Sequence, residues 1–246
     1  FLYIVPTVQT TYDPDRTTKS PGTILNQITT TINNFQTNNL NTFNSVFYYS
    51  QLLSDIDQSD ASIEGTQLAT LMQKRFVPDT ANRTSYFLNF ANKIFNPHPG
   101  HKFAVSSTEF TFSGFQCFFD DDGNGTLRIY RIVDGARQVV RANAGTVNYV
   151  NGSITIESVT ITGYVGDSIK VNAVPAEQNL FPIRNLLLIL ADYTIEVINE
   201  NTNAVVSRST VSTDTQGSTD LSTVSSTTVG TSSSGTGSTI STTYFY

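Results

Sequence analysis

The apolar positions of the first 80 residues follow a strand period, then a helix period, then a strand period again. Residues 1–12 indicate an extended strand that Pro6 interrupts, and Asp13-Pro14-Asp15 forms a turn after it. Ser20 is a typical N-cap, and Pro21 suits the first helical position because its missing N–H would have no partner there. The helix that they open has an apolar stripe formed by Ile24, Ile28, Ile32 and Phe35.

A second helix is predicted from about Thr42 to Asp55, and a polar turn rich in aspartate ends it. Its apolar side would consist of Phe43, Val46, Phe47, Leu53 and Ile56. Residues 62–77 then return to strand character through Ile63, Leu68, Leu71 and Phe76. The first block of the chain therefore predicts the order strand, helix, helix, strand.

From the loop at residues 78–84 to about residue 207 the pattern is β, and two hairpins are its clearest signals. Their turns are Asp120–Gly125, between residues 116–119 and 126–133, and Asn151-Gly152, between residues 147–150 and 153–156. Further strand candidates are residues 86–88, 103–115, 159–161 and 169–171. The run from Leu186 to Leu190 is continuously apolar, which predicts a strand buried on both faces, and residues 193–198 are expected to pair with it.

Residues 207–246 consist almost entirely of Ser, Thr and Gly. Such a segment cannot bury enough apolar surface to offset the entropy of ordering its backbone, about 1–2 kcal/mol per residue. On its own it predicts a flexible tail, and an ordered arm would have to lie on a neighbouring subunit. The closing residues Tyr244, Phe245 and Tyr246 form an anchor pattern for a protein interface, because aromatic side chains bury a large area at low entropic cost. The alternative is a chain end that binds nothing.

Together these segments predict an α+β fold class that is mostly β. We expect an N-terminal strand-helix-helix-strand module at residues 1–80, an antiparallel β-rich domain at residues 81–206, and an extended Ser/Thr-rich C-terminal arm at residues 207–246. Because the chain begins at Phe1, in strand-like sequence with no features of a signal peptide, we expect it to be the C-terminal portion of a longer polypeptide.

Composition agrees with the β prediction and narrows the function classes. Charged residues make up only 14% of the chain, and Thr, Ser and Asn fill the deficit. A net charge of −6 and the lack of any Lys/Arg run argue against a nucleic-acid partner. The single cysteine excludes an intrachain disulfide and a cysteine-based zinc site. The longest apolar run is far shorter than the ~20 residues that span a bilayer, so we expect no membrane partner.

Two segments offer metal ligands, and both have a simpler interpretation. The turn Asp120–Gly125 opens like a calcium loop, but Arg131 stands where the bidentate Glu is needed, and strands flank it. A hairpin turn explains it better. His98 and His101 supply two imidazoles from a loop marked by two prolines and a glycine, with no further ligands nearby. We therefore expect no metal and no cofactor.

Candidate catalytic residues also have simpler interpretations. Asp55, Asp57 and Asp60 could serve acid/base chemistry, but their place at a helix end favours a polar turn. Cys117 lies between aromatic residues of an alternating strand, which favours a small buried hydrophobe over a nucleophile. No phosphate-binding loop is present, because the glycines of the arm lack the required lysine; these are Gly230, Gly235 and Gly237. We expect no catalytic residues and no enzyme activity.

Two blocks of the sequence resemble known proteins. The first reads YIVPTVQTTYDPD, SPGTILNQITTTINNF and TFNSVFYYSQLLSDIDQSDASIEGTQLATLMQKRF. It resembles the baseplate J-like family of contractile phage tails. The second reads FFDDDGNGTLRIYRI, AGTVNYVNGSITI and DSIKVNAVPAEQNLFPIRNLLLI, and it resembles the C-terminal part of the baseplate wedge subunits of T-even-type phages. The resemblance covers roughly residues 1–200 and rests on the order of packing patterns.

This resemblance implies a structural virion protein, a baseplate wedge subunit that forms the inner baseplate ring by homotypic and heterotypic contacts. It implies a second copy of the chain, as in a homodimer, and other baseplate wedge and tail proteins as partners. It also implies a late protein of the virion tail baseplate, assembled in the host cytoplasm. The alternative is a secreted or virion-surface binding module, such as a carbohydrate-binding β-sandwich on a Ser/Thr stalk. The two predicted helices do not suit a simple sandwich, so we rank it second and an enzyme third.

Overall fold

The computed structural model of the chain describes residues 1–181, 186–213 and 225–227. As the sequence predicts, the described chain is mostly β, and its strands join into one mixed sheet. The helical elements are the 3-10 turn η1 (Pro14–Arg16), α1 (Pro21–Phe35), the π turn η2 (Gln36–Leu40) and α2 (Tyr49–Asp57). The strands are β1 (Leu2–Tyr12), β2 (Ile63–Phe76), β3 (Thr84–Asn89), β4 (Val105–Ser107), β5 (Phe110–Phe112), β6 (Phe115–Asp121), β7 (Thr126–Val133), β8 (Ala136–Asn148), β9 (Ser153–Val159), β10 (Ile161–Tyr164), β11 (Ile169–Ala173), β12 (Leu188–Leu190), β13 (Thr194–Asn199), β14 (Ala204–Thr210) and β15 (Ser225–Thr227).

Strand β1 is the centre of the N-terminal part of the sheet, where the order is β15-β14-β13-β1-β2. It pairs antiparallel with β2, from Tyr3 opposite Gln73 to Tyr12 opposite Ile63. On its other side it pairs in parallel, first with β12 and then with β13. The sheet is therefore mixed, not antiparallel throughout. Strands from near the end of the described chain therefore lie beside β1, the strand that the first residues form.

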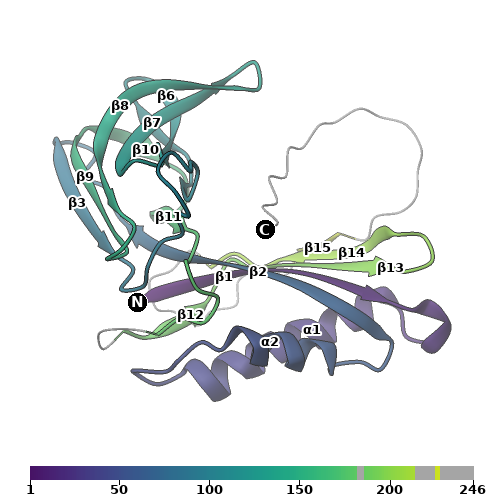
Figure 1. The fold of residues 1–246 in the computed structure, drawn as a ribbon. Helices are drawn as coiled ribbons and strands as arrows, with labels where there is room; N and C mark the ends of the chain where they lie inside the picture. Colours follow the sequence, from purple (N-terminus) through teal and green to yellow (C-terminus); the bar gives the residue numbers. More distant parts are fainter. Residues whose placement is uncertain (182–185, 214–224, 228–246) are drawn as a thin grey trace.

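Helices α1 and α2 lie against one face of this part of the sheet (Figure 1). The Ser20 hydroxyl accepts a hydrogen bond from the Thr23 N–H, so the N-cap forms as the sequence predicts. The predicted apolar stripe of α1 is buried in the core; its residues are Ile24, Ile28, Ile32 and Phe35. Removing such a side chain from water stabilises the fold by about 1.5–3 kcal/mol. Burial of this one helix face therefore fixes α1 to the sheet.

The β-rich part of the chain continues the same sheet through β2, in the order β2-β11-β4-β6-β7-β8-β9-β3. Its strands curl away from the helices at one end of the sheet (Figure 1). The predicted hairpin around Asp120–Gly125 is confirmed, since β6 and β7 pair antiparallel on either side of it. The second hairpin is also present, but its connection runs from Tyr149 to Gly152, so the two-residue turn is corrected to a longer loop.

Three further expectations are corrected. The second helix begins at Tyr49, not near Thr42, because the Phe47 backbone forms an antiparallel bridge with Leu180 and cannot be helical. The predicted pairing of residues 193–198 with residues 186–190 is wrong, because β12 and β13 both pair with β1. The boundary expected at residue 207 lies inside β14, which pairs with β13 as far as Thr210.

Candidate functional site

Part of the outer edge of β2 has no strand partner among the described residues. Strand β11 pairs only with Met72 to Phe76, whereas β1 pairs with β2 as far as Ile63. The free edge, residues 63–71, borders a groove of about 980 Å³. Side chains of Gln67, Ala69 and Leu71 line it from the sheet, and loop residues Phe95, Val174 and Pro175 also line it. We refer to this feature as the β2-edge groove.

A buried ionic cluster holds the residues that follow β14 against the body. The carboxylate of Asp192 lies 3.2 Å from Nη2 of Arg75 and 2.9 Å from Nζ of Lys170. It also accepts a hydrogen bond from the Thr213 N–H at 2.8 Å, and Arg75 donates to the Thr213 carbonyl. Burial by itself raises the pKa of Asp192, but the Thr213 N–H and the two cations outweigh it and hold the pKa below its ordinary value. The cluster therefore fixes the point from which the C-terminal segment leaves the sheet.

A third feature is an apolar surface on the hairpin of β7 and β8, which projects beyond the neighbouring strands (Figure 1). Two apolar side chains on one face of the hairpin are exposed, by 57% at Ile132 and 45% at Val139. Exposed aliphatic side chains that gather on a projecting element are typical of a protein contact surface. We refer to Ile132 and Val139 as the hairpin surface.

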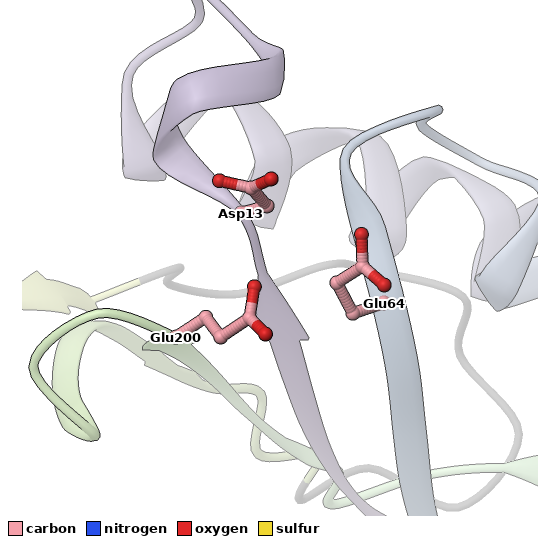
Figure 2. A group of neighbouring side chains, drawn as sticks. All are labelled: Asp13, Glu64 and Glu200. Carbon is pink, nitrogen blue, oxygen red and sulfur yellow. The ribbon is translucent and has the colours of Figure 1, made fainter.

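Three carboxylates meet at one end of the N-terminal sheet, from the N-cap of η1, from β2 and from the turn after β13. Asp13, Glu64 and Glu200 place ligand oxygens within 4.8 Å of one another (Figure 2). Oxygen ligands of this kind could hold a hard divalent cation. Two of the three carboxylates already have partners: Arg16 pairs with Glu64, and Asp13 accepts the Asp15 N–H. The sequence predicted a turn at Asp13 and Asp15, and it gave no signal for Glu64 or Glu200 because their proximity arises only from strand pairing.

The calcium-like turn uses its carboxylates within the chain. Asp120 forms ion pairs with Arg128 at 3.0 Å and Arg137 at 3.2 Å. Asp121 accepts hydrogen bonds from the Val105 N–H and the Tyr149 hydroxyl, while Asp122 accepts the N–H groups that close the turn. Burial raises the pKa of Asp120 above its ordinary value despite the opposing arginines. The hairpin interpretation accounts for all three aspartates.

The structure brings the histidine loop and this turn together, which the sequence did not predict. The Gly100 N–H donates to the Gly123 carbonyl at 2.9 Å, and the Asn96 side chain donates to the same oxygen at 3.1 Å. The rings of His98 and His101 lie edge to face with centroids 5.7 Å apart. Gly123 has a φ of +80°, and a Cβ there would lie 2.4 Å from the Gly100 backbone. Only glycine permits this close approach of the two loops.

The structure also places the candidate catalytic residues Asp55, Asp57, Asp60 and Cys117. Asp60 is buried, forms an ion pair with Lys19 at 2.5 Å, and accepts hydrogen bonds from the Ser62 N–H and hydroxyl. Burial by itself raises the pKa of Asp60, but these partners lower it to about 2. Asp55 and Asp57 lie in the last turn of α2, close to the turn that the sequence predicted. Cys117 is fully buried, which confirms its interpretation as a small core residue, and burial raises the pKa of its thiol.

The aromatic anchor of Tyr244, Phe245 and Tyr246 lies outside the described residues, as do the glycines of the arm. Within the described residues no helix is long and apolar enough to cross a membrane.

Residues 1–75 match the family model described as baseplate structural protein gp6, C-terminal domain III. The match covers β1, α1, α2 and nearly all of β2, so it includes the central pair of the N-terminal sheet and the helices on its face. It supports a phage baseplate structural protein, found in the tail baseplate of the virion and in contact with other baseplate proteins. A search of the curated proteins found no match.

Proposed function

We propose that the chain is the C-terminal portion of a baseplate wedge subunit of a contractile phage tail and forms part of the inner baseplate ring. The observation that carries this proposal is the match of residues 1–75 to gp6 C-terminal domain III. The resemblance of the first block to the baseplate J-like family, and of the second block to T-even-type wedge subunits, points the same way. The partners are a second copy of the chain and other wedge and tail proteins.

The proposed work of the chain is non-covalent assembly without enzyme activity or a cofactor. Two described features suit protein contacts: the β2-edge groove offers backbone groups and apolar walls, and the hairpin surface offers exposed aliphatic side chains. Tyr244, Phe245 and Tyr246 are proposed as further contact residues, because a Ser/Thr-rich arm can extend to a neighbouring subunit and aromatic side chains can anchor it there. When the tail contracts, the proposed motion is a rigid-body shift at these contacts.

Sedimentation velocity over a range of concentrations tests the proposal. The full chain is expected to self-associate as its concentration rises, because a ring subunit needs contacts with its own copies. A chain that ends after Thr227 keeps β14 and β15 and is expected to associate more weakly. A full chain that stays strictly monomeric at high micromolar concentration would overturn the proposal.

The contribution of the hairpin surface is tested by the pair Ile132→Ser and Val139→Ser in one chain. Weaker association is expected, with an unchanged thermal unfolding temperature, since both side chains are exposed. Val165→Ser is the matched control, because Val165 is 67% exposed and lies outside the hairpin. An equal loss of association in the control would remove the hairpin surface from the proposed contacts.

A further inference from the structure

We propose that the β2-edge groove binds the C-terminal segment, residues 228–246, of a second copy of this chain, which adds to β2 as an extra strand. This inference rests on the proposed function and names the surface through which copies join. The β2 edge is part of the described structure, and the segment that would bind it is the end of the chain beyond β15.

The backbone of β2 presents outward-facing groups along the groove, and one of them already has a side-chain partner. Tyr49 Oη donates a hydrogen bond of 2.5 Å to the Leu68 carbonyl, so this carbonyl faces the free edge. Backbone groups of a strand alternate in direction, and the amides of Thr66 and Thr70 therefore face the same way. A free edge of this kind is a template for a further strand, which would bond to the amides of Thr66 and Thr70 and replace Tyr49 at the Leu68 carbonyl.

Most of the free edge lacks the charges and prolines that usually prevent strand addition, and Glu64 near its start is the exception. Natural edge strands carry charged side chains, prolines or bulges that block pairing. Residues 66–71 read TQLATL, with no charge and no proline, and their pairing with β1 is regular along this stretch. The edge is therefore suited to receive a strand, and the loop residues on the groove leave room for one.

The chemistry of the segment matches that of the groove. The groove has polar side chains at Gln9 and Gln67 and apolar ones at Leu71, Phe95 and Val174. The segment likewise changes from Ser, Thr and Gly to a closing Tyr-Phe-Tyr, and none of its side chains is charged. Binding would therefore bury no unpaired side-chain charge, and the aromatic residues could pack against the apolar side chains of the groove.

The topology favours a second copy as the source. The segment begins after β15, and in the order β15-β14-β13-β1-β2 the groove borders the opposite edge. To reach its own groove, the segment would first cross about 19 Å, at ~4.8 Å per strand spacing. Docking on a second copy does not require this crossing. A donor at one edge and an acceptor at the other give a head-to-tail contact, and such contacts repeat around a ring.

Disulfide trapping between two differently tagged chains tests the inference. One chain carries Gln67→Cys in the groove and the other carries Thr242→Cys in the segment; the buried Cys117 stays in both. A disulfide-linked heterodimer is expected after mild oxidation of the mixture. Val150→Cys replaces Gln67→Cys in the control, since Val150 is 72% exposed and does not line the β2-edge groove, and it is expected to give no heterodimer. Absence of the heterodimer, or equal yield in the control, would overturn the inference.

Two matched lysine variants make the test specific to the groove. Ala69 lines the groove, and Thr7 lies directly opposite it on β1, on the same face of the sheet, but does not line the groove. Ala69→Lys in the Gln67→Cys chain is expected to abolish the heterodimer, while Thr7→Lys leaves its yield unchanged. Equal effects of the two lysines would overturn the inference.

Failure of this inference is distinguishable from failure of the proposed function. A chain carrying both Gln67→Cys and Thr242→Cys that forms only an intrachain disulfide would show docking within one copy and overturn docking between copies. If the full chain self-associates in sedimentation velocity without a heterodimer, only the docking site is wrong. If the full chain is strictly monomeric, the proposed function is wrong as well.

Discussion

Arg75 on β2 forms an ion pair with Asp192, the residue whose left-handed backbone lies between β12 and β13, and the side chain of Arg75 is only 1% exposed. The guanidinium also lies over the ring of Tyr3 at 3.9 Å. The pair therefore joins β1 and β2 to the turn between β12 and β13, the two strands that pair in parallel with β1. Lys170 on β11 adds a second cation to the same carboxylate. The Asp192 side chain therefore links the N-terminal sheet to the β-rich part.

Replacing Asp192 with Asn should destabilise the fold by about 3 kcal/mol, because the guanidinium of Arg75, which is only 1% exposed, loses its carboxylate partner. Asn tolerates the left-handed backbone, so the change isolates the charge. Asp134→Asn is the matched control, since Asp134 has the same φ of 50° but is exposed. Chemical denaturation followed by circular dichroism measures both. Similar free energies of unfolding for the two variants would contradict the structural role of the cluster.

Asp60 should make stability depend on pH in the acid range. Its folded-state pKa of about 2 lies below the ordinary value of 3.8, so the stabilisation is fully present above the ordinary value and is lost as the pH falls towards 2. Lys19 is 43% exposed, so solvent screens the pair and we expect a loss of only about 1 kcal/mol. Denaturation of the chain and of Asp60→Asn between pH 5 and pH 2 measures it. Equal pH dependence of the two proteins would show that Asp60 contributes nothing.

Gly123→Ala should be markedly more destabilising than Gly135→Ala. Both glycines have a left-handed φ, near 80°, and each substitution carries a backbone cost of roughly 1–2 kcal/mol. Only at Gly123 would the new Cβ also meet backbone, at 2.4 Å from Gly100 and His101, whereas Gly135 has nothing within 4 Å. Thermal unfolding of both variants compares them. Equal unfolding temperatures would mean that the histidine loop does not pack on the turn as described.

Glu200→Gln should slightly stabilise the fold, because Asp13, Glu64 and Glu200 crowd three carboxylates and only Arg16 is paired with one of them among the described residues. The groups are largely exposed, so the gain should be a few tenths of a kcal/mol and should shrink as salt is added. Glu157→Gln, at an exposed position on β9, is the control. A destabilised Glu200→Gln variant at low salt would show that the repulsion is already relieved.

The sequence predicted the elements that depend on local signals. The N-cap Ser20, Pro21 and the spacing of the apolar stripe specify α1 without reference to the rest of the chain. The turn Asp120–Gly125 was equally predictable from the sequence, because its residues favour the backbone conformations of a turn.

The elements that the sequence did not predict depend on distant partners. Phe43 and Phe47 fit a helical period, yet Phe43 is 66% exposed and Phe47 bridges to Leu180, which no local pattern announces. Parallel pairing of β1 with β12 and β13 joins distant parts of the described chain, so the sequence suggested that the neighbouring runs at 186–190 and 193–198 pair with each other instead. The sequence did not predict the proximity of Asp13, Glu64 and Glu200, or the β2-edge groove, for the same reason. Both arise from strand register and unequal strand lengths.

Cryo-electron microscopy of the phage tail tests the central claim most directly. If the chain is a wedge subunit, side-chain density for the β1, β2 and α1 module should appear in repeated copies within a closed ring of the baseplate. Density for the chain only in an isolated appendage on the tail surface, or its absence from the baseplate, would contradict the account.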